Sequence, residues 1–296
     1  MFSQLNKPLI MGILNVTPDS FSDGGKYTGI NDALKQVERM LAEGVDIIDI
    51  GGESTRPGSD SVSATEQILR VIPVITAIRQ QLKSTILISI DTTSSEVAKA
   101  TLEAGANIIN DVSAGQKDKA ILALAAKSNV PIILMHIQGT PKTMQNDPYY
   151  DDVVSEVISA LKNRTDTALK AGIKKENIAI DPGIGFGKRK QDNLDLLANL
   201  DALVALGFPV LLGTSRKRFM GTLCDVTEPS DLVTATAVTT ALGVMAGVLM
   251  FRVHDVKENR QAADVAWAVR QRVKPRRSVN STNNKIFTFL LRTLRG

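Results

Sequence analysis

The chain has 296 residues, enough to bury the core of one large domain, and its single cysteine, Cys224, excludes a disulfide framework and suits a reducing compartment. Its net charge is +4, but residues 275–296 contain five lysines or arginines and no acidic residue, which leaves −1 for the remainder and argues against a nucleic-acid-binding groove. No apolar run is long enough to span a bilayer and no N-terminal signal is visible, which predicts a cytoplasmic protein.

Short, β-branched apolar runs recur along the chain and predict eight strands. Each run is apolar almost throughout, so each strand should be covered on both faces, as in a parallel sheet. In chain order the runs are Leu9–Leu14, Val45–Ile50, Ile86–Ile90, Asn107–Ile109, Pro131–Met135, Ile178–Ile180, Val210–Leu212 and Val248–Val253.

Segments with helical spacing of apolar residues lie between these runs. They are Asn31–Glu43, Ser63–Leu82, Glu96–Ala104, Asp118–Ser128, Val153–Ala171, Asp192–Leu206, Pro229–Met245 and Asp255–Arg272. Gly44, Gly105, Gly172 and Gly207 stand where four of these helices should end in left-handed caps. Eight strand–helix units predict an α/β fold of the (β/α)8 TIM barrel type. An open doubly wound sheet is the structural rival, but no dinucleotide-binding fingerprint follows the first strand.

Polar or charged residues follow every predicted strand, at the end where barrel enzymes build their sites. Any one of them could cap a helix or fill a turn, but a complete set predicts a polar pocket. The positions are Asn15, Gly51–Gly58, Asp91, Asn110 with Asp111, His136, Asp181, Thr214–Lys217, and Arg252 with His254.

Three of the loops have distinctive compositions. Thr17–Gly29 and Gly51–Ser63 are rich in Gly, Ser and Asp and are expected to close over the site as lids. The run Gly183–Lys188 resembles a phosphate-binding loop, although Arg189 stands where a Walker loop requires Ser or Thr.

Residues 275–296 are predicted to be a basic tail of unknown role, separate from a barrel of residues 1–274. An apolar helical stripe, Phe287, Leu290, Leu291 and Leu294, lies within it. We expect this segment to pack on the barrel or on a second subunit. A helix on a membrane surface is the weaker alternative.

Three long motifs make the chain resemble the dihydropteroate synthases, a family of pterin-binding enzymes. The motifs are Gly12–Gly25, Asp49–Ser59 and Asp181–Lys188, in the order and with the strands of that family. Shorter matches occur at residues 90–92, 110–113, 135–145, 214–217 and 252–256, so the resemblance covers about residues 7–273. Ala114 departs from the family pattern, and the tail has no counterpart in it.

The resemblance implies a condensation of 6-hydroxymethyl-7,8-dihydropterin diphosphate with para-aminobenzoate, giving 7,8-dihydropteroate and pyrophosphate in folate biosynthesis. It places Asp91, Asn110 and Asp181 on the N–H donors of the pterin, Lys217 on its carbonyl side, and Met135 and Phe186 as apolar walls. Helix capping remains an alternative role for Asp91 and Asp181. For His136, a supporting role without substrate contact is favoured over a direct role in binding.

The same resemblance assigns the diphosphate to Asn15, Thr55, Arg252 and His254, with Asn15 associated with Mg²⁺. The aminobenzoate pocket, where sulfonamides act, is assigned to Phe21, Thr55, Arg56, Pro57, Ser215 and Lys217. Arg56 could equally be a solvated surface charge.

Catalysis is expected to follow an SN1-like path through a cation on the exocyclic methylene, because an aniline nitrogen needs no strong base. Asp91, Asp181, Lys217 and Arg252 would be the catalytic residues, acting by position and charge. A pterin-binding methyltransferase domain and a non-catalytic pterin-binding paralogue remain alternatives. The loop Asp49–Ser59 and the pair Arg252 and His254 argue against the first, and the intact cationic set argues against the second. A homodimer is expected from the family.

Overall fold

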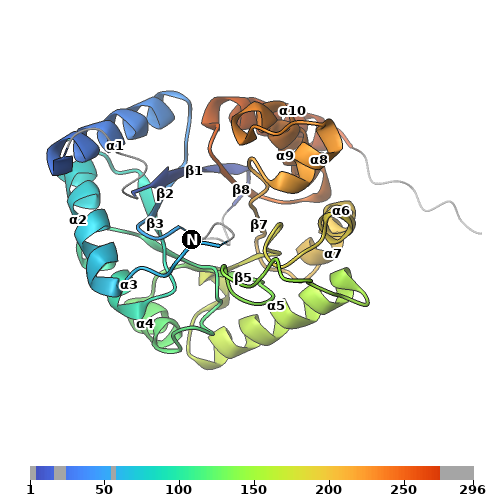
Figure 1. Cartoon of the computed structure of the whole chain (residues 1–296), viewed down its shortest axis with the longest axis horizontal. Coiled ribbons are helices and arrows are strands. Elements are labelled where there is room, and N and C mark those ends of the chain that lie inside the picture. Colours follow the sequence, from blue (N-terminus) through green and yellow to red (C-terminus); the bar gives the residue numbers. More distant parts are fainter. Residues whose placement is uncertain (1–4, 17–24, 55–57, 274–296) are drawn as a thin grey trace, which may run out of the picture.

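A computed structural model describes residues 5–16, 25–54 and 58–273, with side chains in residues 25–28 left out. Eight parallel strands alternate with helices around a barrel axis, and Figure 1 shows the helices as an outer ring. The strands are β1 (Leu9–Asn15), β2 (Ile47–Gly51), β3 (Leu87–Asp91), β4 (Ile108–Asp111), β5 (Ile132–Met135), β6 (Ile178–Asp181), β7 (Leu211–Leu212) and β8 (Met250–Val253).

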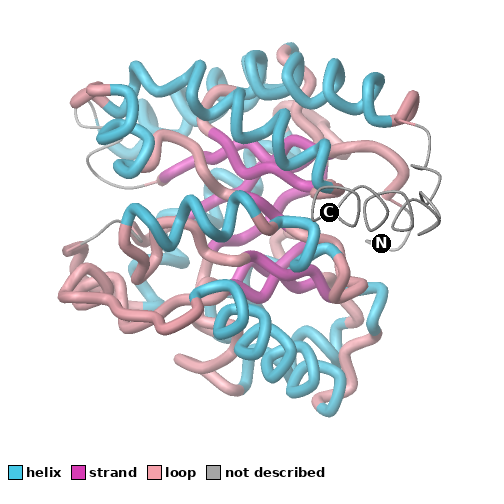
Figure 2. Tube along the Cα trace, turned by 90° about the vertical axis from the view of Figure 1, so that its right-hand side faces the viewer, coloured by secondary structure: helices cyan, strands magenta, loops and turns pink. Residues whose placement is uncertain are grey.

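The helices cover the outside of the strands, and Figure 2 shows strands between two layers of helix. They are α1 (Gly25–Ala42), α2 (Ala64–Gln80), α3 (Ser95–Glu103), α4 (Ala120–Ser128), α5 (Val153–Lys170), α6 (Lys190–Ala198), α7 (Leu200–Val204), α8 (Arg218–Cys224), α9 (Val233–Ala246) and α10 (Val256–Arg270), with 3-10 turns η3 (Lys175–Asn177) and η4 (Pro229–Leu232). Among the described residues, no helix has both the length and the apolar character needed to cross a membrane.

The predicted barrel is confirmed, and the doubly wound alternative is wrong. The hydrogen-bonded order is β6-β5-β4-β3-β2-β1-β8-β7, so β1 pairs with both β2 and β8. An isolated parallel bridge between Ile180 and Val210 joins β6 to β7 and brings the ring together.

Three local predictions need correction. Helix α1 begins at Gly25, before the predicted start at Asn31, and Ile30 adds one turn to the apolar stripe of Leu34 and Val37. The helix predicted over residues 192–206 is two helices, α6 and α7, separated at Asn199, whose φ of −121° is not helical. The short helix α8 follows β7, where no helix is expected from the sequence.

Two apolar cores result from the alternation of side chains along each strand. The outer core lies between the strands and the helices. The inner core closes the lower barrel with Met11, Ile47, Ile108, Ile133, Ala179, Leu211 and Met250. Two residues further along four of these strands, the same inward direction belongs to Asp49, Asn110, Asp181 and Arg252. The strand period therefore places polar side chains above an apolar floor.

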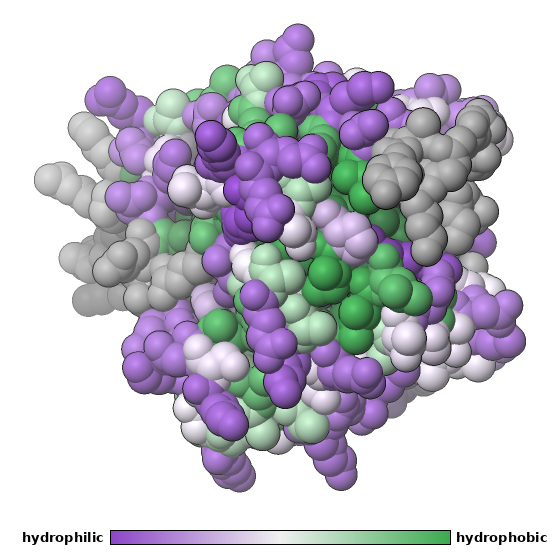
Figure 3. All heavy atoms as spheres, turned by 90° about the vertical axis from the view of Figure 1, so that its left-hand side faces the viewer, coloured by the Kyte–Doolittle hydropathy of each residue, from purple (hydrophilic) through white to green (hydrophobic). Residues whose placement is uncertain are grey.

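The outside of the barrel is mainly polar where its helices meet solvent. Figure 3 shows the side covered by α1, α2 and α3, where hydrophilic side chains spread over the surface with apolar areas between them.

The four predicted glycine caps all have positive φ, from 75° at Gly207 to 112° at Gly105.

Candidate active site

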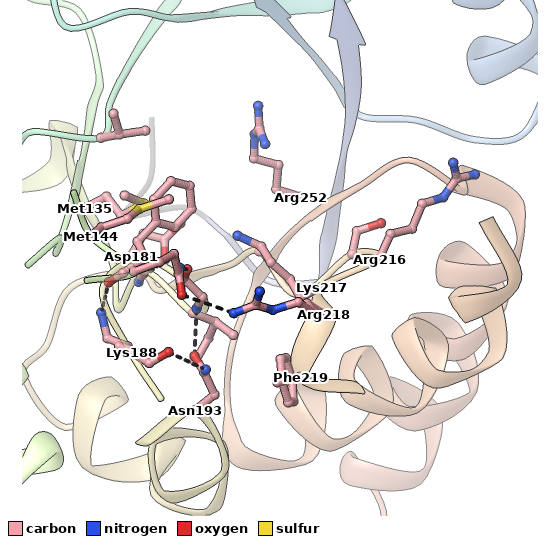
Figure 4. Close-up of a pocket in the computed structure, with 18 of the residues that line it drawn as sticks. Met135, Met144, Asp181, Lys188, Asn193, Arg216, Lys217, Arg218, Phe219 and Arg252 are labelled. Carbon is pink, nitrogen blue, oxygen red and sulfur yellow. Dashed lines mark hydrogen bonds between the residues drawn. The ribbon is translucent and has the colours of Figure 1, made fainter. Parts of the chain in front are cut away.

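A cavity of about 900 Å³ opens at the carboxyl ends of the strands. Ten predicted site residues line it: Asn15, Asp91, Asn110, Met135, Asp181, Phe186, Ser215, Lys217, Arg252 and His254. Figure 4 shows Met135 and Asp181 on one side of the cavity and Lys217 and Arg252 on the other. Four other predicted site residues, Phe21, Thr55, Arg56 and Pro57, lie outside the described residues.

The guanidinium group of Arg252 is held between two carboxylates. Its Nε donates to Asp49 Oδ2 at 2.6 Å, and its Nη2 donates to Asp91 Oδ2 at 2.7 Å. The Asn110 side-chain amide also donates to Asp49 Oδ2, at 3.3 Å, which leaves the Asn110 carbonyl oxygen to accept from a ligand. Three neighbouring strands thereby orient one cation over the apolar floor.

Electrostatics in this cluster reflect burial and mutual charge. Burial raises the pKa of Asp91 to about 7, opposed by Arg252 and reinforced by Asp49 and Asp111. Burial alone would lower the pKa of Arg252, but Asp49 and Asp91 raise it, so this guanidinium stays charged. The Asp91 carboxyl is therefore buried beside a permanent cation that opposes the rise of its pKa.

Asp181 meets a different set of partners at the end of β6. Its Oδ1 accepts a hydrogen bond from the Gly183 backbone N–H at 2.7 Å. Burial raises its pKa, while that hydrogen bond and then Lys217, Arg252 and Lys188 act in the opposite direction. Gly213 follows β7 and has no side chain between Asp181 and Arg252; a β-carbon there would lie 3.9 Å from an atom of each.

Helix capping does not explain either carboxylate. Helix α3 is capped by Ser94, three residues beyond Asp91. Helix α6 begins at Lys190, nine residues beyond Asp181. The residue that precedes it, Arg189, donates its backbone N–H to the side chain of Asp192. Both carboxylates are thus placed by strand ends rather than by helix starts.

Cations and an aromatic ring complete the β6–β7 side. The Lys217 ammonium lies 4.0 Å from the centre of the Phe186 ring. Burial lowers the pKa of Lys217 to about 8, with Asp181 opposing the shift. Ser215 Oγ lies 3.0 Å from His254 Nδ1 and accepts from the His254 backbone N–H at 3.1 Å, which fixes the β7 loop against the end of β8.

Two buried charged side chains at the site are not identified by the sequence analysis. Asp49 is fully buried in β2, yet its motif is read from the sequence only as a lid beginning at the strand end. A carboxylate inside an apolar strand, on the same face as Ile47, is the signal that could have revealed it. Lys188 lines the cavity and is hydrogen-bonded to His136, which is 52 positions away, and no sequence pattern predicts this pairing.

Among the described residues, no three histidine, cysteine, aspartate or glutamate side chains are grouped so that they could hold a metal ion. Asn15 offers an amide oxygen at the end of β1, beside Gly51 at the end of β2. Any divalent cation here would need most of its oxygen ligands from a bound anion and water.

Comparison with known proteins agrees with this geometry. The family model described as pterin binding enzyme matches residues 11–254. A dihydropteroate synthase of Synechocystis is 45% identical over 269 residues, covering 91% of this chain and 92% of that protein. The Yersinia pestis dihydropteroate synthase with a sulfonamide drug superimposes with a TM-score of 0.84 at 42% identity, covering 90% of this chain and 96% of the other. The Xanthomonas albilineans enzyme in complex with 7,8-dihydropteroate gives 0.80 at 41% identity, covering 92% and 96%.

Proposed function

The chain belongs to the family of pterin-binding enzymes and has the activity of a dihydropteroate synthase, and we propose how its residues divide the reaction between them. The reaction joins 6-hydroxymethyl-7,8-dihydropterin diphosphate to para-aminobenzoate and releases pyrophosphate. The observation that carries the proposal is the meeting of Asp91, Asn110, Asp181, Lys217 and Arg252 around one cavity.

The pterin ring is assigned to the deep part of this cavity. Its amidine-like edge presents N–H donors, and Asp91, Asn110 and Asp181 present acceptor oxygens from three strand ends. Lys217 is assigned to the carbonyl side of the ring. Met135 and Phe186 are assigned to its apolar walls. A ring bound in this way would satisfy polar groups that are costly to leave buried and unpaired.

The diphosphate is assigned to Arg252, His254 and Asn15, which lie at and just beyond the ends of β8 and β1. Arg252 offers a planar fork for phosphate oxygens, and Ser215 already orients the His254 ring. We propose Mg²⁺ as the cofactor, held by Asn15 together with diphosphate oxygens and water. The donor set fits a hard cation with oxygen ligands that arrives with its anion. When bound, Mg²⁺ would neutralise charge on the leaving group.

Bond breaking is proposed to precede bond making. The dihydropterin stabilises a cation on its exocyclic methylene as pyrophosphate leaves, and Asp91 and Asp181 favour that cation. Arg252 and His254 hold the departing anion. The aniline nitrogen then attacks the methylene carbon through its lone pair, without a strong base, and the anilinium-type nitrogen so formed loses its proton to water or to the departing pyrophosphate. Asp255, the carboxylate next to His254, is bound by both Nε and Nη2 of Arg216.

The aminobenzoate is assigned to the outer cavity, beside Ser215 and Lys217 on the β7 loop. Phe21, Thr55, Arg56 and Pro57 stay predictions for this pocket, and Thr55 also for the diphosphate. A sulfonamide would compete with aminobenzoate here, in keeping with the drug complex of the Yersinia pestis enzyme.

A homodimer is proposed through the face formed by α9 and α10, which pack against each other. This face exposes Val238, Leu242, Met245, Val265 and Val269, each more than 40% accessible. Sedimentation of the purified protein tests the assembly.

A cytoplasmic location is also proposed, supported by the single free cysteine, Cys224.

Pyrophosphate release tests the activity directly. We expect release that requires both the pterin diphosphate and para-aminobenzoate. A pterin-binding methyltransferase domain would give none, and a non-catalytic paralogue would bind pterin without turnover. Either result would contradict the proposed function.

A further inference from the structure

A lysine ammonium is buried behind the pterin side of the cavity. Lys188 is only 3% exposed. Its Nζ lies 2.9 Å from His136 Nδ1 and donates to the Phe186 carbonyl oxygen at 3.1 Å. Both hydrogen-bond partners are neutral groups. A buried ammonium with neutral partners is destabilising unless its charge also interacts favourably with a nearby negative group.

The loop held by Lys188 carries the predicted pterin wall. Three of its carbonyl groups accept side-chain hydrogen bonds: Gly185 from Gln145 and Gly187 from Tyr150, both on the segment after β5, and Phe186 from Lys188 of the loop itself. At Gly183 and Gly187 φ is positive, and β-carbons there would overlap the carbonyl oxygens of His136 and Gln138. The loop therefore lies directly on the segment after β5, and Lys188 links the two.

The proton in this pair belongs to Lys188. Burial, and then the Lys188 charge, lower the pKa of His136 to about 3, so its ring is neutral and accepts from the ammonium at Nδ1. Burial lowers the pKa of Lys188 to about 7, opposed by Asp181. The other charged groups facing Lys188 are Lys217 and Asp192, and Asp192 is bound by Arg189.

We propose that Lys188 is a positioning residue for the pterin: it fixes the loop that carries Phe186 and supplies a positive charge behind the Asp181 carboxylate. This inference rests on the proposed function, because it needs the pterin to bind at Asp181. Lys188 acts through Phe186 and Asp181. Its charge should matter most where the lysine is fully protonated, well below its pKa of about 7.

The test is direct binding of 6-hydroxymethylpterin, measured by calorimetry on wild-type protein and Lys188→Met. We expect the variant to bind the pterin about tenfold more weakly near pH 6. The ratio of the two dissociation constants should shrink toward about pH 9, because wild-type Lys188 loses its charge in that interval. Pyrophosphate affinity should stay within about twofold, since Lys188 is bonded to His136 and Phe186 and not to the diphosphate residues Arg252 and His254. The thermal midpoint should be unchanged or raised, since a buried charge is removed.

Lys170→Met, at an exposed lysine that ends α5, is the matched control and should bind like the wild type. Lys188→Gln keeps a donor without the charge, and it replaces the first variant if that protein does not fold. Equal pterin affinity in wild type and variant would overturn the inference and leave the proposed function standing. A loss of pterin affinity that is independent of pH and accompanied by a lower thermal midpoint would also overturn the inference. Failure of the wild-type protein to bind pterin would overturn the proposed function and this inference together.

Discussion

Arg252 donates a hydrogen bond to Asp49 at 2.6 Å across 203 positions of the sequence. Asp49 is fully buried, and it also accepts from Asn110. A cation assigned to the diphosphate and an amide assigned to the pterin thus share one carboxylate that does not itself line the cavity. Removing one member of such a buried pair costs about 3–5 kcal/mol in other proteins, so the remaining members depend on it.

Asp49→Asn should therefore weaken both substrate interactions at once. The amide keeps the shape but loses the charge that orients Arg252, and we expect kcat/KM for the pterin diphosphate to fall by at least about tenfold. Asp46→Asn is the control, because Asp46 pairs with Arg260 near the start of β2, away from the cavity. It should lower the thermal midpoint with little effect on kcat/KM. Normal kcat/KM in Asp49→Asn would contradict the assigned role.

Asp91→Asn and Asp181→Asn should keep the fold and remove most of the activity. The lost bonds are charge-assisted, so each loss should exceed the roughly 1 kcal/mol of a neutral hydrogen bond. Steady-state kinetics with circular dichroism checks this. Near-normal turnover in both variants would refute the pterin assignment.

Binding of aminobenzoate should depend on pyrophosphate. If the leaving group and Mg²⁺ order the lids, aminobenzoate or a sulfonamide should bind weakly to the free protein and much better once both are added. Calorimetry with and without pyrophosphate measures the difference. Equal affinities would argue against the ordered path.

His136 should make the protein less stable in acid. Its pKa is lowered to about 3 in the folded protein, against 6.5 for the free side chain. Between these values the unfolded chain binds a proton that the folded protein excludes, so stability falls as pH drops below about 6.5. The thermal midpoint of wild type relative to His136→Gln should decline over that range. A constant difference would show that His136 is not held neutral.

Deleting residues 275–296 should leave turnover within a few-fold, while solubility or self-association could change. These residues lie outside the described part, and the described site residues run only from Asn15 to His254. Kinetics of the truncated protein provide the check. A folded truncation that loses affinity for both substrates would place the tail at the cavity, and the predicted division at residue 274 would be wrong.

Much of the barrel is predictable because its cause is local. Buried parallel strands need nearly continuous apolar runs, and helices between them need a stripe of period 3.6, so both patterns are legible along the chain. The strand ends follow, and with them Asp91, Asn110, Asp181 and Arg252. The break at Asn199 and the helix α8 are less legible, since packing decides where marginal helices stop.

The sequence alone determined the fold class, the end of the barrel that carries the site and the family of the enzyme. Only the tertiary structure decided that Asp49 holds Arg252 and that Lys188 meets His136 behind the pterin wall. The physical reason is that strand and helix periods act over a few residues, whereas a buried charge is stabilised by whichever partner the closed barrel brings within about 3 Å. That partner can stand anywhere along the chain.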